Sequence, residues 1–319
     1  MNSRSMRAAV RSEYGTENVL SIQDVDVPSP SKGEVLIEVR ASSMNQGDWL
    51  MLQGNPWLVR LFTGLFRPRK RGVGLDVAGV VVAVGSGVSR LALGDEVYGE
   101  VSGAMAQYAI GAEKRLAHKP RNLSFEEAAA VPVAGVTALQ ALRDKVSMTS
   151  GMRVLVIGAS GGVGSFAVQV AKAFGAQVTA VGSTRNVELM RSIGAADVID
   201  YSVDDFTKTE QRFDAILDLV GSQSIGACRR ILTSSGVYIS SSGRLGAVFS
   251  AMLWSLVPGS RVKMLAAMCN TDDLEEMAGL IEAGKVKPLI DRRFTLADVG
   301  AAFGYQGEGH ARGKSIVVV

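Results

Sequence analysis

The feature that most restricts the fold of this chain is the segment at residues 154–164, which reads VLVIGASGGVG. Its apolar start predicts a buried strand, its glycines predict a tight turn, and an apolar run with helical spacing begins at Val163. Glycine lets backbone N–H groups approach a phosphate, and a helix N-terminus adds partial positive charge. The segment therefore predicts a pyrophosphate site of a dinucleotide, although a turn whose glycines serve packing alone is the alternative. The expected lining residues are Ser160, Gly161, Gly162 and Val163.

The pattern around this segment changes along the chain. Before residue 123, short apolar runs alternate with turns, as at 35–39, 77–84 and 96–98, which is typical of an all-β module. Beyond it, strand-like and helical runs alternate, which indicates a doubly wound parallel sheet. The expected strands are 153–157, 177–181, 198–201, 213–220, 237–240 and 261–266. The expected helices are 163–174, 187–193 and 273–283.

The change of pattern coincides with a helix start. Ser124 and Glu127 have the spacing of a capping box, and a helical run at 128–142 follows them. Towards the C-terminus the chain returns to short mixed elements and ends in an expected strand at 315–319. We therefore expect a domain boundary near residue 123 and a C-terminal segment that rejoins the first domain.

Composition excludes several classes of protein. The 319 residues include 34 Lys and Arg against 31 Asp and Glu, and this net charge of +3 argues against a nucleic-acid-binding protein. The two cysteines and two histidines have spacings that support neither a structural zinc site nor a disulfide framework. No stretch reaches the roughly 18 apolar residues of a membrane-spanning helix, and the N-terminus lacks a signal-peptide core. We expect a soluble protein of the reducing cytoplasm.

The glycine segment is compatible with two dehydrogenase families. Gly158, Gly162 and Gly164 also fit the GxxxGxG pattern of short-chain dehydrogenases. Those enzymes use a Tyr-x-x-x-Lys pair for proton transfer, and none of the six tyrosines here has Lys four residues later. The long segment that precedes the glycines is a second mismatch, so the short-chain family is excluded.

The chain resembles, almost from end to end, the medium-chain dehydrogenase/reductase superfamily, within it the zinc-free quinone oxidoreductase branch that includes zeta-crystallin. Around the glycines, the residues from Gly151 to Lys172 fit that branch at every constrained position. The resemblance continues at residues 44–48 (MNQGD), 74–79 (GLDVAG), 94–97 (GDEV), 130–138 (AVPVAGVTA) and 309–314 (GHARGK). It implies an α/β protein in which a GroES-like β-rich domain carries an inserted Rossmann domain. The domain bounds expected are 1–123, completed by 285–319, and 124–284.

The resemblance also bears on metal chemistry. Zinc enzymes of the superfamily take ligands from Cys and from a Gly-His-Glu segment, where this chain has Asn45 and, at residues 74–76, Gly-Leu-Asp. Without three strong ligands there is no Lewis acid, so we expect no metal and a substrate that is already electrophilic. Quinones and the activated double bonds of enones meet that need. The resemblance implies that Asn45 and Asp48 orient the site, while capping of their own loop is the alternative.

The expected cofactor is NADPH. An NAD site of this fold has an acid at the end of the second strand, whereas residues 181–186 here read VGSTRN. Ser183, Thr184 and Arg185 can instead hold a 2′-phosphate. The resemblance adds Tyr201 at the adenosine phosphate end. Further cofactor contacts that it implies are Asn45 and Thr137 and, with packing as the alternative, Val220 and Lys314.

The remaining features leave alternatives open. No general acid is evident, because His118 and His310 fall outside the expected site, and water is the expected proton source. The apolar segments 49–66 and 248–257 can form the walls of a pocket for a small apolar substrate. The alternatives are that they pack inside the protein or contact a second subunit or a membrane surface. The basic run 67–71 is either a solvated loop or a surface that attracts anions. The expected strand at 261–266 would lie at an edge of the sheet, and we expect a homodimer in which two copies pair through this edge. The rival functions are a metal-free NADP-dependent alcohol or aldehyde reductase and a non-catalytic nucleotide-binding protein.

Overall fold

The computed structural model describes residues 4–57, 59–242, 244–309 and 311–319, with the backbone alone at Phe62 and Leu245. Its internal contacts divide the chain into two units. Unit 1 comprises Met1–Ala134, Cys269–Glu282 and Pro288–Val319, and unit 2 comprises Gly135–Met268 and Ala283–Lys287. These bounds differ from the expected ones at 124–134 and 269–282, which fall in unit 1, and at 285–287, which fall in unit 2. The hydroxyl of Tyr98, in the β-rich part of unit 1, donates to the carbonyl of Leu274 and ties the second stretch there.

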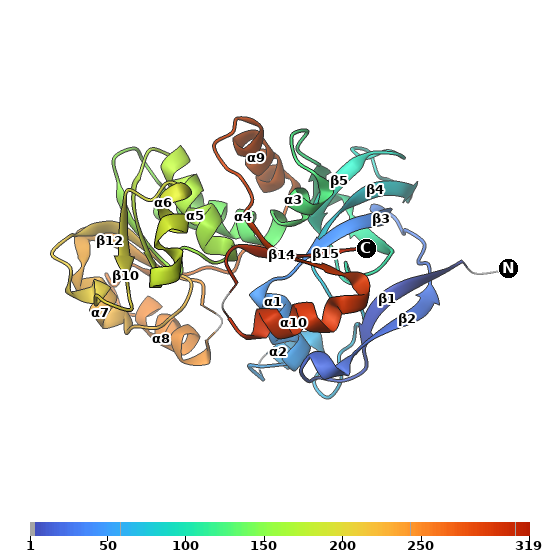
Figure 1. Ribbon diagram of the computed structural model, residues 1–319, viewed down its shortest axis with the longest axis horizontal. Helices are drawn as coiled ribbons and strands as arrows, with labels where there is room; N and C mark the ends of the chain where they lie inside the picture. The colour runs from blue at the N-terminus through green and yellow to red at the C-terminus, as the bar shows by residue number, and fades with distance from the viewer. Residues whose placement is uncertain (1–3, 58, 243, 310) are drawn as a thin grey trace. The chain divides into compact units, whose positions relative to one another are not determined.

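Unit 1 is built on a seven-stranded sheet with the strand order β14-β15-β3-β4-β5-β7, in which β6 also pairs with β3. Its strands are β3 (Glu34–Ser43), β4 (Asp76–Val84), β5 (Glu96–Glu100), β6 (Tyr108–Ala112), β7 (Leu116–His118), β14 (Ile290–Thr295) and β15 (Lys314–Val318). A separate hairpin consists of β1 (Ser5–Arg11) and β2 (Leu20–Asp26). Alternate residues of β3 and β4, among them Val35, Ile37 and Val77, are buried in one core. The C-terminal strand β15 pairs antiparallel with β3, next to which it is drawn in Figure 1.

Short helices complete unit 1. They are α1 (Gln46–Gln53), α2 (Val59–Thr63), α3 (Phe125–Ala129), α9 (Thr271–Glu282) and α10 (Val299–Gly307), with 3-10 turns at Glu17–Val19, Glu113–Arg115 and Leu296–Asp298. The predicted capping box is confirmed, because Ser124 N donates to Glu127 Oε2 at 2.9 Å and Glu127 N donates to Ser124 Oγ at 3.2 Å.

The single helix expected at 128–142 is wrong. Helix α3 ends at Ala129, α4 (Pro132–Gln140) starts afresh, and a π-helical turn, Ala141–Val146, follows. Pro132 has no N–H for a helical hydrogen bond and disfavours helical backbone at the preceding residue, so the helix breaks there.

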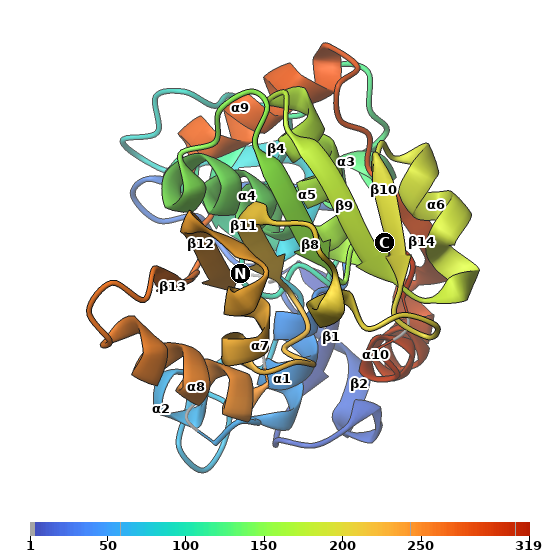
Figure 2. The same ribbon diagram turned by 90° about the vertical axis from the view of Figure 1, so that its left-hand side faces the viewer.

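Unit 2 contains a six-stranded sheet whose neighbouring strands all run parallel, with the order β10-β9-β8-β11-β12-β13 (Figure 2). The strands are β8 (Arg153–Ile157), β9 (Gln177–Gly182), β10 (Asp197–Asp200), β11 (Phe213–Asp218), β12 (Leu232–Ser240) and β13 (Val262–Met264). The order reverses between β8 and β11, which is where doubly wound sheets bind ligands. The predicted fold class is therefore confirmed.

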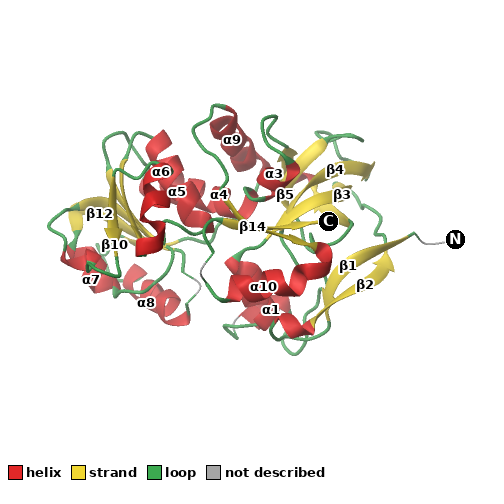
Figure 3. Cartoon of the chain, viewed as in Figure 1, coloured by secondary structure: helices red, strands yellow, loops and turns green. Residues whose placement is uncertain are grey.

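Helices connect these parallel strands and are drawn in red in Figure 3. They are α5 (Gly162–Ala173), α6 (Val187–Ser192), α7 (Ile225–Arg230) and α8 (Leu245–Ser255), with 3-10 turns at Thr184–Asn186 and Phe206–Lys208. Helix α5 buries Phe166, Val168 and Val170, so the run after the glycines is a core helix. In the part of the chain that the structure describes, no helix is long and apolar enough to cross a bilayer.

Candidate active site

The glycine segment of unit 2 forms the turn between β8 and α5. Gly158 has a φ of +84°, which favours glycine, and a Cβ on Gly164 would lie 2.1 Å from the carbonyl oxygen of Gly158. The turn itself therefore requires these two glycines. Gly161 is different, because a Cβ there would meet no atom closer than 3.5 Å, and its φ of −81° suits any residue. Backbone conformation thus accounts for Gly158 and close packing for Gly164, but neither accounts for Gly161, the N-cap of α5.

A buried amide joins this turn to the loop after β9. Asn186 Nδ2 donates to Ser160 Oγ at 2.9 Å and to Ser183 Oγ at 3.3 Å. The Oδ1 atom of Asn186 is buried and has no hydrogen-bond partner among the described residues. A buried acceptor without a donor is a position that a bound polar ligand or water fills. Asn186 was not among the predicted site residues, although it directly follows Ser183, Thr184 and Arg185, which were.

The carboxyl ends of β8, β9 and β10 meet at one edge of the parallel sheet. Val181 pairs with Ile157, and Gly182 pairs with Asp200, so this edge gathers the glycine turn, the loop after β9 and Tyr201. Tyr201 is 60% exposed, and Arg185 is exposed as well. A hydrogen bond from the Thr184 side chain is the main cause that lowers the pKa of Asp200. Thr184 therefore already has a partner within the protein.

The loop after β11 adjoins the same turn. Asp218 Oδ1 accepts from the N–H groups of Val220 at 2.9 Å and of Gly221 at 2.7 Å. A Cβ on Gly158 would lie 2.7 Å from Val220 Cγ2, so Val220 packs over the glycine turn. Thr137 is buried on α4, and its expected contact with a cofactor stays a prediction.

In unit 1 the expected residues Asn45 and Lys314 meet around a carboxylate that the sequence analysis passed over. Asp76 Oδ2 accepts from Ser43 Oγ at 2.7 Å, from Asn45 Nδ2 at 2.8 Å and from Lys314 Nζ at 3.1 Å. Lys314 Nζ also donates to Asn45 Oδ1. Asp76 itself is fully buried. An acid directly before the apolar strand-forming run 77–84 was the signal that pointed to it.

The second oxygen of Asp76 completes this buried polar cluster. Asp76 Oδ1 accepts from the N–H of Val133 at 2.9 Å. The carboxylate of Asp76 thus accepts hydrogen bonds from three side chains and one backbone N–H. The side-chain amide of Asn45 is held between Asp76 and Lys314.

Asp48 lies one helical turn beyond Asn45. Its Oδ2 accepts from the N–H of Asn45 at 2.9 Å, which is the capping arrangement that the sequence left as an alternative. Its Oδ1 is buried without a hydrogen-bond partner among the described residues. Burial, and next the charge of Asp76, raise the pKa of Asp48 to about 7, against the opposing effect of the Asn45 hydrogen bond. Asp48 is therefore a carboxyl group that can hold or release a proton near neutral pH.

The donor set of this cluster does not fit zinc. Asn45 presents an amide and Leu75 presents an apolar side chain. The carboxylate of Asp76 already accepts hydrogen bonds from four donors. Within the described ranges, no three His, Cys, Asp or Glu side chains are grouped so that they could hold a metal ion. His118 ends β7 at the surface, with Nδ1 4.0 Å from Asp95 Oδ2, and His310 lies outside the described residues.

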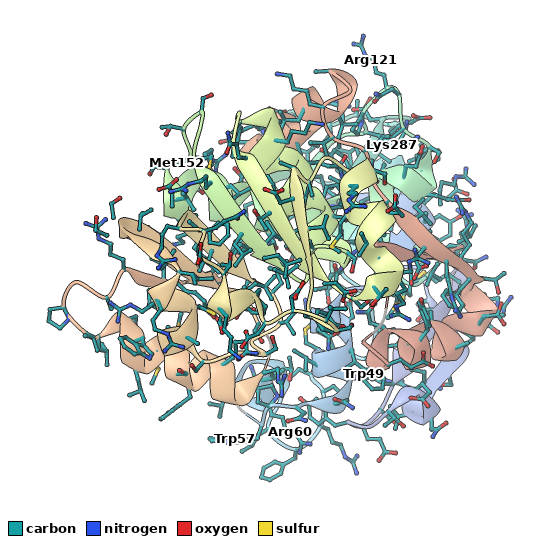
Figure 4. The ribbon with its side chains drawn as sticks, turned by 60° about the vertical axis from the view of Figure 1, so that its left-hand side comes forward. Trp49, Trp57, Arg60, Arg121, Met152 and Lys287 are labelled. Atoms are coloured by element: carbon teal, nitrogen blue, oxygen red, sulfur yellow. The ribbon has the colours of Figure 1, made fainter. Side chains whose placement is uncertain are left out.

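The two apolar segments differ in the structure. In segment 49–66, Trp49 packs on Gly307 of α10, while Trp57 is 62% exposed. Figure 4 labels both of these side chains, together with Arg60. Segment 248–257 falls on and after α8 and exposes Phe249, Leu253 and Leu256. Their expected role as walls of a substrate pocket stays a prediction.

Comparison with known proteins adds an independent line of evidence. A family model described as zinc-binding dehydrogenase matches residues 193–317, and one described as alcohol dehydrogenase GroES-like domain matches residues 31–141. The chain is 37% identical to 2-methylene-furan-3-one reductase of Solanum lycopersicum, over 98% of this chain and 79% of that protein. It is 36% identical to the chloroplastic NADPH-dependent alkenal/one oxidoreductase of Arabidopsis thaliana, over 98% and 80%. The solved quinone oxidoreductase from Coxiella burnetii is similar with a TM-score of 0.87 and 29% identity, over 99% of this chain and 100% of that one.

Proposed function

Because the chain belongs to the medium-chain dehydrogenase/reductase superfamily, in its quinone oxidoreductase branch, we propose that it reduces quinones or the activated double bond of enones with NADPH. The observation that carries this proposal is the cluster around Asp76, which supplies hydrogen-bond donors and an ammonium where the zinc enzymes need metal ligands. A conjugated carbonyl delocalises the negative charge that develops during reduction. Such a substrate therefore needs orientation more than it needs a Lewis acid.

The residues of unit 2 fit a dinucleotide. Gly161 leaves room for close approach at the N-terminus of the twelve-residue helix α5, and the free acceptor of Asn186 lies beside Ser160. We assign the pyrophosphate to Ser160, Gly161, Gly162 and Val163. When bound, NADPH supplies the hydride.

The preference for NADPH over NADH is assigned to the loop after β9. Residues 183–186 carry two hydroxyls and a guanidinium and no acid, which suits a 2′-phosphate better than a free ribose hydroxyl. Ser183 and Arg185 hold that phosphate, and Tyr201 lies against the adenosine end. Thr184 contributes less, because its side chain already bonds Asp200.

In unit 1 the chain's own residues orient the substrate and exclude a metal. The amide of Asn45 is fixed by Asp76 and Lys314, so it does not need to be ordered when a ligand arrives. Asn45 and Lys314 act as site and cofactor contacts, and Asp48 positions Asn45 through its backbone N–H. Water delivers the final proton.

Steady-state assays separate this proposal from its rivals. With NADPH, the purified protein is given a quinone, an enone and a saturated aldehyde of the same chain length. Reduction of the quinone or enone with little turnover of the aldehyde supports the proposal. Preference for the aldehyde favours a metal-free alcohol or aldehyde reductase, and tight NADPH binding without any turnover favours a non-catalytic nucleotide-binding protein.

The assembly and compartment are proposals as well. Strand β13 is the last strand of its sheet, and a second copy that pairs with this edge would form a symmetric dimer. Sedimentation at micromolar concentration tests this, and a mass of one chain argues against it. Cys228 and Cys269 are buried and unpaired, which suits a reducing compartment such as the cytoplasm.

A further inference from the structure

A cavity of about 300 Å³ lies in unit 1, and its lining includes residues of helix α1 and of the basic run 67–71. Met51 and Val73 belong to its apolar lining. The charged residues that line it are Arg11, Asp48, Arg69 and Lys70. Such a mixture of an apolar wall and converging charges is typical of a ligand site.

Two of these charged groups are buried and incompletely bonded. Arg11 is 6% exposed and Asp48 is 3% exposed. Arg11 Nε and Asp48 Oδ1 have no hydrogen-bond partner within the described part of the chain. Both atoms are closed off from solvent, so the two residues line the cavity with their other atoms.

The guanidinium of Arg11 is fixed from within the protein. One of its terminal nitrogens donates to the carbonyl of Met51, and its plane lies over the ring of Tyr14, with 5.3 Å between the guanidinium carbon and the ring centroid. The group is therefore held in place before a ligand binds, which reduces the entropy lost on binding. Its positive charge therefore stays beside the cavity that it lines.

The charge balance of the cavity favours an anion. Arg11, Arg69 and Lys70 carry three positive charges, and the only acid among the lining residues is Asp48. The pKa of Asp48 is raised to about 7 by burial, so near neutral pH much of it is a neutral hydrogen-bond donor. A carboxylate can pair with the exposed side chains of Arg69 and Lys70, and Arg11 adds positive charge to the same cavity. An alkyl chain attached to the carboxylate can pack on Met51 and Val73.

We propose that this cavity binds the carboxylate end of an amphipathic ligand, so that the preferred substrates are enones whose apolar chain ends in a carboxylate. The enone part of this inference rests on the proposed function. The carboxylate part does not, because it concerns binding alone.

The basic run offers matched variants. Arg67, Arg69 and Lys70 are all exposed, but only Arg69 and Lys70 line the cavity. The double variant Arg69→Gln, Lys70→Gln removes two cavity charges without touching the buried groups. The variant Arg67→Gln removes a charge from the same run and serves as the control.

Calorimetric titration of the whole protein with hexanoate and with neutral hexanamide tests the binding. We expect wild type and the Arg67 variant to bind hexanoate at least about tenfold more tightly than hexanamide, and the double variant to lose about tenfold for hexanoate alone. Equal affinity for the two probes would overturn the inference. So would equal losses in the double variant and the control, or inorganic phosphate that competes as well as hexanoate, since these indicate general attraction of anions.

Kinetics then test the substrate class. We compare kcat/KM for 7-oxooct-5-enoate and for its methyl ester, two enones with the same carbon chain, of which only the first has a charged distal group. The acid is expected to be preferred about tenfold by wild type and not by the double variant. Reduction of both without preference overturns the inference and leaves the proposed function standing. Tight hexanoate binding with reduction of neither enone, and of no quinone in the steady-state assays, refutes the proposed function and leaves the carboxylate site standing.

Discussion

Lys314 Nζ lies 3.1 Å from Asp76 Oδ2, and the two side chains are only 3% and 0% exposed. The pair joins β15, at the C-terminus, to the start of β4. Removing one member leaves the other as a buried charge with no opposite charge. We therefore expect Lys314→Met to lower the free energy of unfolding by about 3–5 kcal/mol.

Urea unfolding of wild type and of Lys314→Met checks this expectation, with Lys114→Met, at an exposed lysine, as the control. Combining Lys314→Met with Asp76→Asn should recover part of the loss, because no buried charge then remains unpaired. A loss in Lys314→Met no larger than in the control would show that the pair does not stabilise the fold.

Asp48 should make stability depend on pH. The folded protein raises the pKa of Asp48 from 3.8 to about 7, so the folded chain keeps a proton that the unfolded chain releases in this window. The contribution of Asp48 to stability therefore falls as pH rises from about 4 to about 7, by at most about 1.4 kcal/mol per pH unit.

The variant Asp48→Asn removes this titration and keeps an oxygen that can accept from Asn45 N. Relative to wild type, its free energy of unfolding should rise steadily between pH 5 and pH 7 in urea titrations. A difference that stays constant over these pH values would mean that Asp48 titrates normally.

Much of the fold could be predicted from sequence, because periodicity and turn residues are local properties. The strands from β8 to β13 and the capping box of Ser124 fall where the pattern placed them, except that β12 begins at Leu232 and not at 237. The break at Pro132 was missed, since the apolar spacing continues on both sides of it.

The polar cluster of unit 1 was predicted less completely. Asn45 and Lys314 came from a resemblance, but their contact with Asp76 depends on β15 pairing with β3, and no local pattern encodes that pairing. The open acceptor of Asn186 and the unpaired Nε of Arg11 were missed for the same reason. Whether a buried group lacks a partner is decided by tertiary packing.

Gly161 should be needed for the cofactor and not for the fold. Its Cβ would meet no atom closer than 3.5 Å, so Gly161→Ala should fold with nearly unchanged stability, whereas the added methyl group obstructs approach of a phosphate to the backbone. We expect NADPH affinity to fall at least about tenfold, or about 1.4 kcal/mol. Calorimetry measures this, with Gly226→Ala, in open space on α7, as the control. Unchanged NADPH affinity would move the pyrophosphate away from this turn.

Arg185 should distinguish the two nicotinamide cofactors. A charge-assisted contact with the 2′-phosphate stabilises binding by ~1.5–3 kcal/mol, so Arg185→Ala should weaken NADPH roughly tenfold to a hundredfold and leave NADH nearly unchanged. Titration of both cofactors into both proteins decides it. Equal weakening of the two would assign Arg185 to the fold, and no weakening would assign the phosphate to Ser183, Tyr201 or another base.

The central claim is that this chain reduces an activated double bond with NADPH and without a metal. Its most direct test is the rate of NADPH-dependent enone reduction, confirmed by product analysis, before and after exhaustive treatment of the purified protein with a strong chelator. The account predicts the same turnover in both samples, with far less than one zinc per chain by elemental analysis. Stoichiometric zinc whose removal abolishes turnover would contradict it.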